Sequence, residues 1–336
     1  MTISYHSGGR LQGLSTDTKS SNVPNYSRFE ETDTRKIYTK LTDGNWYELG
    51  NLNPFNAIRG LFGGGYTSSL VNTIDYITIA TTGNATDFGD RTISTYVGTT
   101  CASETRGVWA GGTSNETTMD YVTIATTGNA TDFGDLYSGH GNMGGLSDRS
   151  RGIFGGGGYT PIVNSIHYIT ISTPSNSLDF GDLTVARRSS SGVASSTRGV
   201  VGGGAEPSNS NVMDYITIAT LGNATDFGDL TVARNYPMSV HSSTRGVFGG
   251  GGGYNNVMDY ITIDTTGNAI DFGDLTVARY IANNGASSET RGVFGGGYTG
   301  SNTDVMDYIT IATTGNATDF GDLTVARHGV MGLSGK

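Results

Sequence analysis

Short runs of alternating apolar and polar residues, separated by glycine, serine and asparagine, fill most of this chain. The stretch 189–234, for example, contains "SSGVASST", "RGVVGGG", "NVMDYITIA" and "ATDFGDLTVAR" in that order. The first run consists of small residues, the second is apolar and ends in glycines, and the third is rich in β-branched residues, as strands are. No run is long enough, or periodic enough at 3.6 residues, to predict a helix. The pattern therefore predicts four short strands within this stretch.

The same four runs recur six times along the chain, at intervals of about 45 residues, which is typical of a four-stranded propeller blade. The Arg of "RG(V/I/L)(F/W/V)" opens each unit and the Phe of "DFGD" lies near its end. A Gly-Asn turn in "TTGNA" joins the third run to the fourth as antiparallel neighbours. The repeat predicts an all-β fold, a six-bladed β-propeller over residues 59–336. Its units start near residues 59, 106, 151, 198, 245 and 291.

The two ends of the repeated region predict how the propeller closes. The first unit begins directly with "RGLFGGG" at Arg59 and has no good small-residue run before it. The last unit continues past its final strand into "HGVMGLSGK" (328–336), which aligns with the first runs of the other units. We therefore expect this tail to pair into blade one, because closure removes two open strand edges.

Residues 1–58 do not repeat and are predicted to form a separate N-terminal docking arm. Residues 1–26 are rich in Ser, Gly, Asn and Thr, a composition typical of disordered segments. The stretch 35–49, "RKIYTKLTDGNWYEL", places Asp43-Gly44 between two strand-like runs and predicts a β-hairpin. A lone hairpin needs a partner surface, so we expect the arm to dock onto a larger assembly or onto sister copies, unless it folds back on its own propeller. The docking residues we expect are Arg35, Ile37, Tyr38, Trp46 and Tyr47.

Composition narrows the functional classes. The 336 residues include 53 glycines and only 35% hydrophobic residues, which suits short strands and tight turns. A net charge of −10 argues against nucleic acid and anionic membrane as partners. No apolar run approaches the ~18 residues that span a bilayer, and the start "MTISYHSGGR" lacks a signal-peptide pattern. The single cysteine, Cys101, excludes an internal disulfide framework and is best interpreted as a small buried side chain.

None of the chemical motifs in the sequence predicts catalysis, a metal or a cofactor. "DFG" occurs six times without the other kinase motifs, and "FGGGGYT" lacks the GK[ST] of a phosphate-binding loop. The five histidines are scattered, without metal-ligand spacing. The paired acids of each "DFGD", such as Asp226 and Asp229, leave two interpretations open. One is a calcium site, and the one we favour is a hydrogen-bonded ladder with the Arg of "TRG".

Differences among the six units concentrate in two of the four connections. The segments after the second and fourth strands vary, whereas "TRG" and "TTGNATDFGD" are nearly constant. In an antiparallel meander the two variable connections emerge on one face, where repeat proteins usually bind their partners. Tyrosines among Ser, Thr and Asn suit a sugar or a polar protein surface, and drift in unused loops is the alternative. The candidate ligand-binding residues on this variable face are Tyr66, Tyr159, Tyr254, Tyr298, Tyr236, Tyr280, His140 and Arg188.

The runs "RGVFGGG", "VMDYITI" and "DFGDLTVAR" resemble a kelch repeat, and the resemblance covers residues 59–336. It departs from the kelch pattern because Phe stands in place of Trp and the spacing from Tyr to this aromatic residue is longer. Arrays of "ATTGNATDFGDLTVAR" preceded by "RFEETDTRKIY" and "DGNWYELG" also resemble structural proteins of marine tailed bacteriophages. These resemblances imply a kelch-like propeller in a virion that is assembled in the host cytoplasm.

The sequence therefore predicts a non-enzymatic virion accessory protein of the tail-fibre or head-decoration type. The arm would contact other virion proteins, several copies would be present, and the variable face would bind a host surface glycan or another virion protein. One alternative is a purely structural component without a host ligand, and another is an enzyme acting on glycans. An enzyme would need acids that converge at one point, and Glu116, Glu206 and Asp304 are the only acids in the loops after the second strands.

Overall fold

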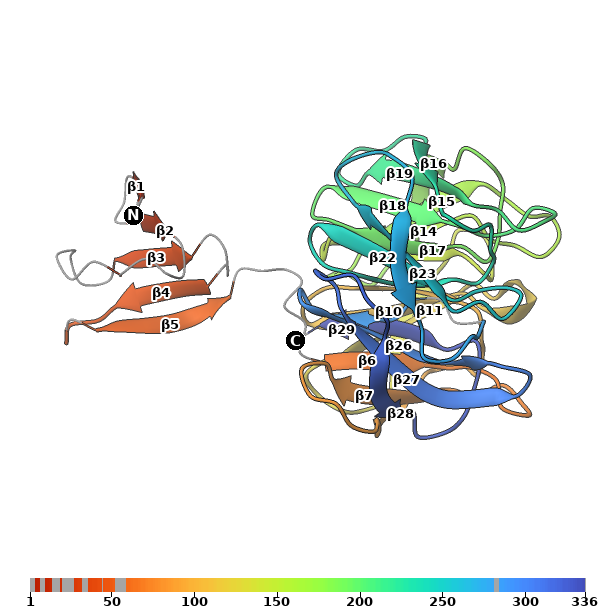
Figure 1. The fold of residues 1–336 in the computed structure, drawn as a ribbon, viewed down its shortest axis with the longest axis horizontal. Coiled ribbons are helices and arrows are strands. Elements are labelled where there is room, and N and C mark those ends of the chain that lie inside the picture. Colours follow the sequence, from red (N-terminus) through yellow and green to blue (C-terminus); the bar gives the residue numbers. More distant parts are fainter. Residues whose placement is uncertain are drawn as a thin grey trace. The chain divides into compact units, whose positions relative to one another are not determined.

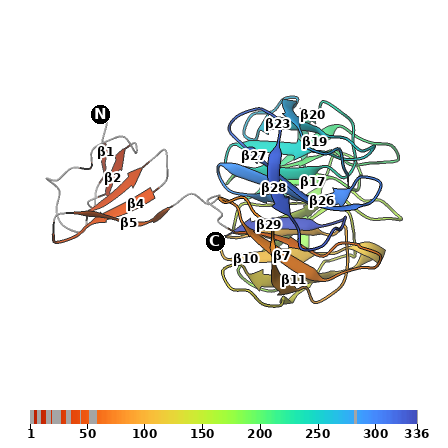
Figure 2. The ribbon, with the colours of Figure 1, turned by 60° about the horizontal axis from the view of Figure 1, so that its bottom comes forward.

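A computed structural model of the chain divides it into two compact units, Met1–Asn56 and Ala57–Lys336. The structure describes residues 59–280 and 284–335 and, before them, residues 4–6, 10–13, 19, 27–31, 36–43 and 45–51. Both units are built almost entirely from β-strands (Figures 1 and 2). One short 3₁₀ helix, Thr113–Asn115, is the only helix among these residues.

The N-terminal unit is a five-stranded sheet in the order β1-β2-β3-β4-β5 (Figure 1). The predicted hairpin is present, because β4 and β5 pair antiparallel. Although the composition of residues 1–26 is typical of disorder, β1 and β2 within them pair with each other. β2 also runs parallel to β3, so the five strands satisfy one another's backbone hydrogen bonds. The strands are β1 (Ser4–His6), β2 (Arg10–Gly13), β3 (Arg28–Glu31), β4 (Lys36–Lys40) and β5 (Trp46–Asn51).

The second unit consists of six four-stranded antiparallel sheets, in which consecutive strands are neighbours. Sheet one contains β29, β6, β7 and β8, and sheets two to six follow in chain order from β9 to β28. The first strands of neighbouring sheets contact one another, which gives an all-β, propeller-like architecture. The strands of sheets one to three are β6 (Arg59–Gly63), β7 (Thr73–Thr78), β8 (Thr86–Asp90), β29 (Met331–Gly335), β9 (Thr99–Ala102), β10 (Arg106–Ala110), β11 (Thr118–Thr123), β12 (Thr131–Asp135), β13 (Gly144–Ser147), β14 (Arg151–Gly155), β15 (Ser165–Thr170) and β16 (Leu178–Asp182). Those of sheets four to six are β17 (Ser191–Ala194), β18 (Arg198–Gly202), β19 (Val212–Thr217), β20 (Thr225–Asp229), β21 (Met238–His241), β22 (Arg245–Gly249), β23 (Val257–Thr262), β24 (Ile270–Asp274), β25 (Ala286–Ser287), β26 (Arg291–Tyr298), β27 (Asn302–Thr310) and β28 (Thr318–Asp322).

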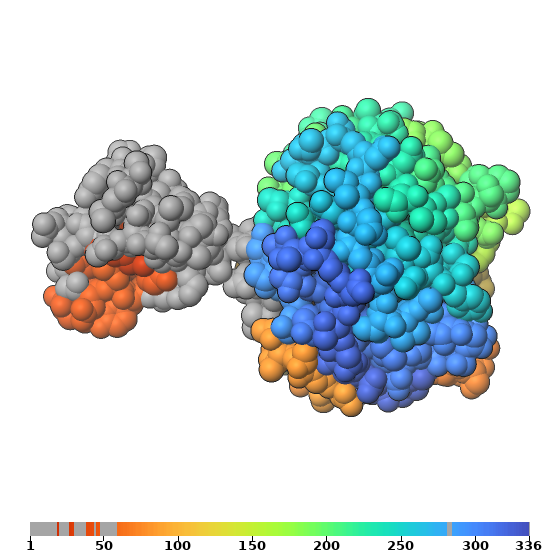
Figure 3. Space-filling model, in the orientation of Figure 1, coloured from red at the N-terminus to blue at the C-terminus, as the bar shows by residue number. Residues whose placement is uncertain are grey.

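The C-terminal residues complete sheet one. β29 pairs antiparallel with β6 over five residues, the pairing that the sequence predicts for the tail. All five residues of β29 are buried. Figure 3 shows the dark-blue C-terminal part bordering the orange part that follows residue 59. The beginning and the end of the repeated region therefore share one sheet.

Glycine recurs after the second strand and within the fourth strand for steric reasons. In sheet four, Gly203 follows β18 with a φ of 69°, a conformation that residues with a Cβ rarely adopt. Gly228 of "DFGD" has a φ of 136° and lies opposite the bulge between Met213 and Asp214. A Cβ on Gly228 would come within 2.6 Å of the Gly267 backbone in sheet five. These glycines therefore permit the close approach of neighbouring sheets.

Apolar side chains fill the space between neighbouring sheets. Between sheets four and five, Phe227 contacts a cluster that includes Phe248 and Ile261, all of them buried. Six such clusters occur in the described residues, and each spans two adjacent sheets. One of them joins sheet six to sheet one through Val293 and Phe62. Burial of this apolar surface is the main favourable term in holding the sheets together.

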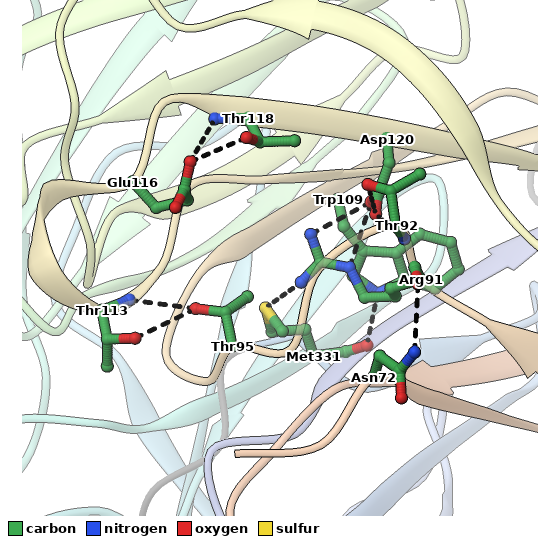
Figure 4. Close-up of polar contacts among 10 residues, drawn as sticks. All are labelled: Asn72, Arg91, Thr92, Thr95, Trp109, Thr113, Glu116, Thr118, Asp120 and Met331. Carbon is green, nitrogen blue, oxygen red and sulfur yellow. Dashed lines mark hydrogen bonds and ion pairs between the residues drawn. The ribbon is translucent and has the colours of Figure 1, made fainter.

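Buried ion pairs also link neighbouring sheets. Figure 4 shows Arg91, in the segment after β8, directed at Asp120 of β11 in the next sheet, 3.0 Å away. Thr92 donates a second hydrogen bond to the same carboxylate. Both charged side chains are fully buried, so each supplies the partner that the other needs away from water. The other four such pairs in the described part of the chain are Arg187–Asp214, Arg234–Asp259, Arg279–Asp307 and Arg327–Asp75.

The predicted ladder between the Arg of "TRG" and the acids of "DFGD" is wrong. The aspartates of the ion pairs belong to the third strands, at the position before Tyr in "VMDY", and four of the five arginines end the run "LTVAR". In sheet four, Arg198 of "TRG" instead donates to the Ile263 carbonyl of sheet five. Its guanidinium lies over the Tyr215 ring, 4.5 Å from the centroid. The "TRG" arginines thus bind a carbonyl and an aromatic face, which suits their half-buried positions.

The turn between the third and fourth strands of one sheet covers the outer edge of the preceding sheet. Gly267 donates its N–H to the Phe227 carbonyl, and the Asn268 side chain accepts the N–H of Asp229. The asparagine bond recurs at all six sheet contacts, including the contact of sheet six with sheet one. An uncovered strand edge invites aggregation. This contact explains why "TTGNATDFGD" is nearly constant among the units.

Removing one partner of a buried ion pair tests its contribution to stability. We expect D259A to destabilise the chain by about 3–5 kcal/mol, since it leaves the buried Arg234 charge without a partner. The control D271A removes an exposed carboxylate of the same sheet and should cost less than about 0.5 kcal/mol. Urea unfolding followed by circular dichroism measures both free energies. Equal losses in the two variants would contradict a structural role for the pair.

Candidate functional site

The two variable connections lie side by side, as the sequence predicts for one face. Short backbone bridges join Tyr66 to His328, Arg188 to Ala205, and Tyr280 to Tyr298. In each bridge, one residue follows the second strand of a sheet and the other follows the fourth strand of the preceding sheet. Side chains from the two kinds of loop are therefore brought together at the boundaries between sheets.

Tyrosine rings from several of these loops contact one another around His328. Its ring centroid lies 5.3 Å from that of Tyr66, 5.6 Å from that of Tyr96 and 5.3 Å from that of Tyr298. Tyr66 and Tyr96 also contact each other, at 5.8 Å. The His328 Nδ1 is fixed by Asn302 at 2.5 Å. These residues come from sheets one and six and from the segments that follow them.

The aromatic contacts continue from Tyr298 toward sheets four and five. Tyr298 lies 6.4 Å from Tyr254 in a stacked arrangement, and 5.6 Å from Tyr280. Tyr280 in turn contacts Tyr254 at 5.2 Å and Tyr236 at 6.5 Å. The result is one continuous group of rings, which we call the tyrosine surface. It consists of Tyr66, Tyr96, Tyr236, Tyr254, Tyr280, Tyr298 and His328.

Two predicted residues lie near the tyrosine surface without belonging to the contacts above. Burial raises the pKa of Tyr159 to about 12, and the nearby hydroxyls of Tyr236 and Tyr96 add to this rise. The Asn142 side chain and the positive charge of Arg188 act in the opposite direction. Tyr159 and Arg188 therefore face the same region as the aromatic group. Arg188 places a positive charge there in a chain of negative net charge.

His140 does not join the tyrosine surface. It occupies the position at which four other segments carry the arginine of a buried ion pair, and its ring lies 5.9 Å from that of His167. Two members of the surface, Tyr96 and His328, were missed by the sequence prediction. Both lie in the segments recognised as variable, "STYVGTT" and "HGVM", so the pattern could have included them.

The loops that carry these rings are held by backbone hydrogen bonds from sheet to sheet. The Val97 N–H donates to the Gly329 carbonyl, and the Asn142 N–H donates to the Val97 carbonyl. Ser189 and Tyr236 continue the series, each donating to the previous member. All five residues have φ between 52° and 68°. A left-handed conformation is costly for residues with a Cβ, and it persists only where the surroundings impose it.

The first strands of all six sheets line a central cavity of about 40 Å³, room for about three waters. Asn284 bridges the strands: its amide donates to the carbonyls of Thr100 and Gly145 and accepts from the hydroxyls of Ser191 and Ser239. Arg149 lines the same cavity. A cavity of this size cannot admit a sugar or a peptide.

The three acids in the loops after the second strands belong to three different sheets. Glu116 accepts hydrogen bonds from Thr118 in its own loop. Glu206 belongs to sheet four, and Asp304 lies in β27 of sheet six. No group of three or more His, Cys, Asp or Glu side chains in the described part of the chain is arranged to hold a metal ion. Cys101 is buried, and burial raises the pKa of its thiol.

The predicted docking residues of the arm fall in the N-terminal sheet, apart from Arg35, which lies outside the described residues. Tyr38 stacks against the Lys19 ammonium, 3.9 Å from the ring centroid. Trp46 contacts buried Phe29 edge to face at 6.1 Å. Tyr47 is exposed and donates its hydroxyl to Asp43. Ile37 lies in β4.

Comparison with known proteins gives no relative from which a function could be transferred, since the chain matches neither a protein-family model nor a curated protein. Within the described ranges, no helix is long and apolar enough to span a membrane.

The raised pKa of Tyr159 gives a pH-dependent prediction. Tyrosine ordinarily ionises near pH 10, and a raised pKa means that Tyr159 keeps its proton up to about pH 12. The difference in ultraviolet tyrosinate absorbance between the wild type and Y159F should therefore develop near pH 12. A difference that is complete by about pH 10 would show that Tyr159 is exposed to solvent.

Proposed function

We propose that the second unit is a closed, six-bladed, kelch-like propeller that acts as a rigid binding module without catalytic activity. Six equivalent four-stranded sheets support this architecture. The hydrophobic cluster and the Arg327–Asp75 pair between sheets six and one support closure, as does the pairing of β29 with β6. Rigidity suits binding, because loops that are already ordered lose little entropy when a ligand arrives.

The observation that carries the binding function is the tyrosine surface. Aromatic rings offer a large contact area at a low entropic cost, and tyrosine hydroxyls add hydrogen bonds. A saccharide presents both C–H faces for the rings and hydroxyls for polar partners. We assign the variable face to a host surface glycan or to another virion protein, with Tyr254 and Tyr298 as the central contacts. Tyr254 is 47% exposed, so its ring is accessible to a ligand.

The biological setting follows from the resemblance to phage structural proteins. In this proposal the chain is a virion accessory protein of the tail-fibre or head-decoration type, present in several copies. The N-terminal sheet attaches it to other virion proteins, and exposed Tyr47 is one contact of this attachment. A purely structural component without a host ligand is the second candidate, since the nearly constant repeats serve the contacts between sheets.

Truncation tests the closure. Deleting residues 329–336 removes β29, exposes the edge of β6 and uncovers the cluster around Phe62. We expect this variant to lose cooperative thermal unfolding and to aggregate, because an open apolar edge recruits other chains. Deleting residues 1–56 instead, which form a separate compact unit, should leave the unfolding transition intact. A C-terminal truncation that melts like the wild type would contradict closure.

Binding is tested with the full-length chain, fluorescently labelled and mixed with host cells. Saturable binding should fall at least tenfold in Y254A/Y298A, because the double variant removes two stacked rings from the surface. The control L221A changes an exposed side chain in the turn between β19 and β20 and should bind as the wild type does. If the wild type shows no binding to cells but still joins the virion, the purely structural function is the better one.

A further inference from the structure

The contact between sheets two and three differs from the other five. At the position of the buried arginine it has His140, and at the position of the aspartate in the third strand it has His167. The threonine whose hydroxyl donates to the aspartate elsewhere, such as Thr184, is replaced by Tyr137. Three positions that form one polar contact have thus changed together, and each now carries an aromatic side chain.

The two imidazoles face each other across the contact between the sheets. Their centroids lie 5.9 Å apart, with an angle of 47° between the ring planes. The Nε2 of His140 contacts the Ser138 hydroxyl at 2.9 Å, and Tyr137 covers His167 edge to face at 6.0 Å. His167 is 98% buried, since only 2% of its surface is exposed. Its Nδ1 has no hydrogen-bond partner within the described residues.

A buried imidazole nitrogen without a partner is costly, and such groups in native structures call for a ligand, an ion or a water. Burial lowers the pKa of His167 to about 4, and burial also lowers that of His140. The neighbouring His140 lowers the pKa of His167 further, and Asp179 on the paired strand β16 acts in the opposite sense. Burial therefore favours the neutral form of both rings. Neutral imidazole is the form that binds transition metals.

We infer that His140 and His167 form a two-imidazole binding site for a divalent transition metal ion of the zinc type. Two imidazoles that share a tetrahedral zinc ion, with Zn–N bonds near 2.1 Å, have centroids roughly 5–6 Å apart. The observed 5.9 Å lies in that range. The ion would take the remaining ligands from water or from the Ser138 hydroxyl.

A metal bound here would link β15 to the segment after β12, in the place where the other contacts have an ion pair. With two protein ligands the site is open, so the metal would exchange with solution and would not be required for folding. The nitrogen ligands favour zinc, copper or nickel and disfavour calcium and magnesium. This inference does not depend on the proposed binding function of the variable face.

The test is zinc chloride titrated into the full-length chain after treatment with a chelator. We expect one equivalent to bind by calorimetry and to raise the midpoint of thermal unfolding. H167N should weaken zinc binding at least tenfold, because it removes the buried ligand. The control H241N alters a half-buried histidine of another sheet, whose Nδ1 contacts the Ser242 carbonyl, and should leave zinc binding unchanged.

A second variant distinguishes loss of the zinc site from loss of the fold. Y137T/H140R/H167D installs the three side chains found at four of the other contacts, so it should fold with a midpoint at or above that of the metal-free wild type. It should show no stabilisation by zinc, although it keeps His6, His241 and His328. The inference is overturned if zinc stabilises this variant as much as the wild type, or if the wild type binds no zinc. Either result would mean that the histidines only replace the ion pair with an aromatic contact and bind no metal.

Discussion

The buried ion pair between neighbouring sheets is the constraint on which the rest of the second unit depends. An arginine and an aspartate away from water are stable only where they meet, so each pair fixes the offset between two sheets. Arg234 shows that these arginines bind more than their aspartates. Besides Asp259, its guanidinium donates to the carbonyls of Val257 and Phe248, so one side chain binds two strands of the next sheet. Apolar packing alone is non-directional and would tolerate sliding of one sheet over another.

The runs that fix the offset between sheets are nearly constant among the units, whereas the remaining loops vary. The contacts between sheets use "LTVAR", "VMDY" and "TTGNATDFGD", and these runs change little among the units. Beyond these runs, the loops after the second and fourth strands contact the neighbouring sheet through backbone groups, so their side chains can differ among the units. Hydrogen bonds between their backbones still hold these loops in place, as the series from Val97 to Tyr236 shows. The tyrosines therefore belong to loops with a fixed backbone, although these loops differ in sequence.

The sequence predicts what depends on local pattern. Strand periodicity, the repeat, the hairpin near Asp43 and the pairing of the C-terminal tail all follow from spacing within one or two units. The choice of partner in each ion pair does not follow from local pattern. Each unit offers several arginines and acids, and only the offset between sheets selects Arg234 for Asp259 over Arg198 for Asp229. For the same reason, the sequence did not predict the contact between His140 and His167, whose spacing along the chain is not that of metal ligands.

The central cavity is too small for a sugar or a peptide, which supports the proposal that binding takes place on the loops outside it. Asn284 lies just before β25, and its side chain bridges the first strands of four other sheets. The bridge leaves space for a few waters only. A ligand larger than that meets the loops outside, where the rings of Tyr254, Tyr280 and Tyr298 lie together. Since these rings are positioned before a ligand arrives, affinity should depend on the number of rings it covers more than on rearrangement of the loops.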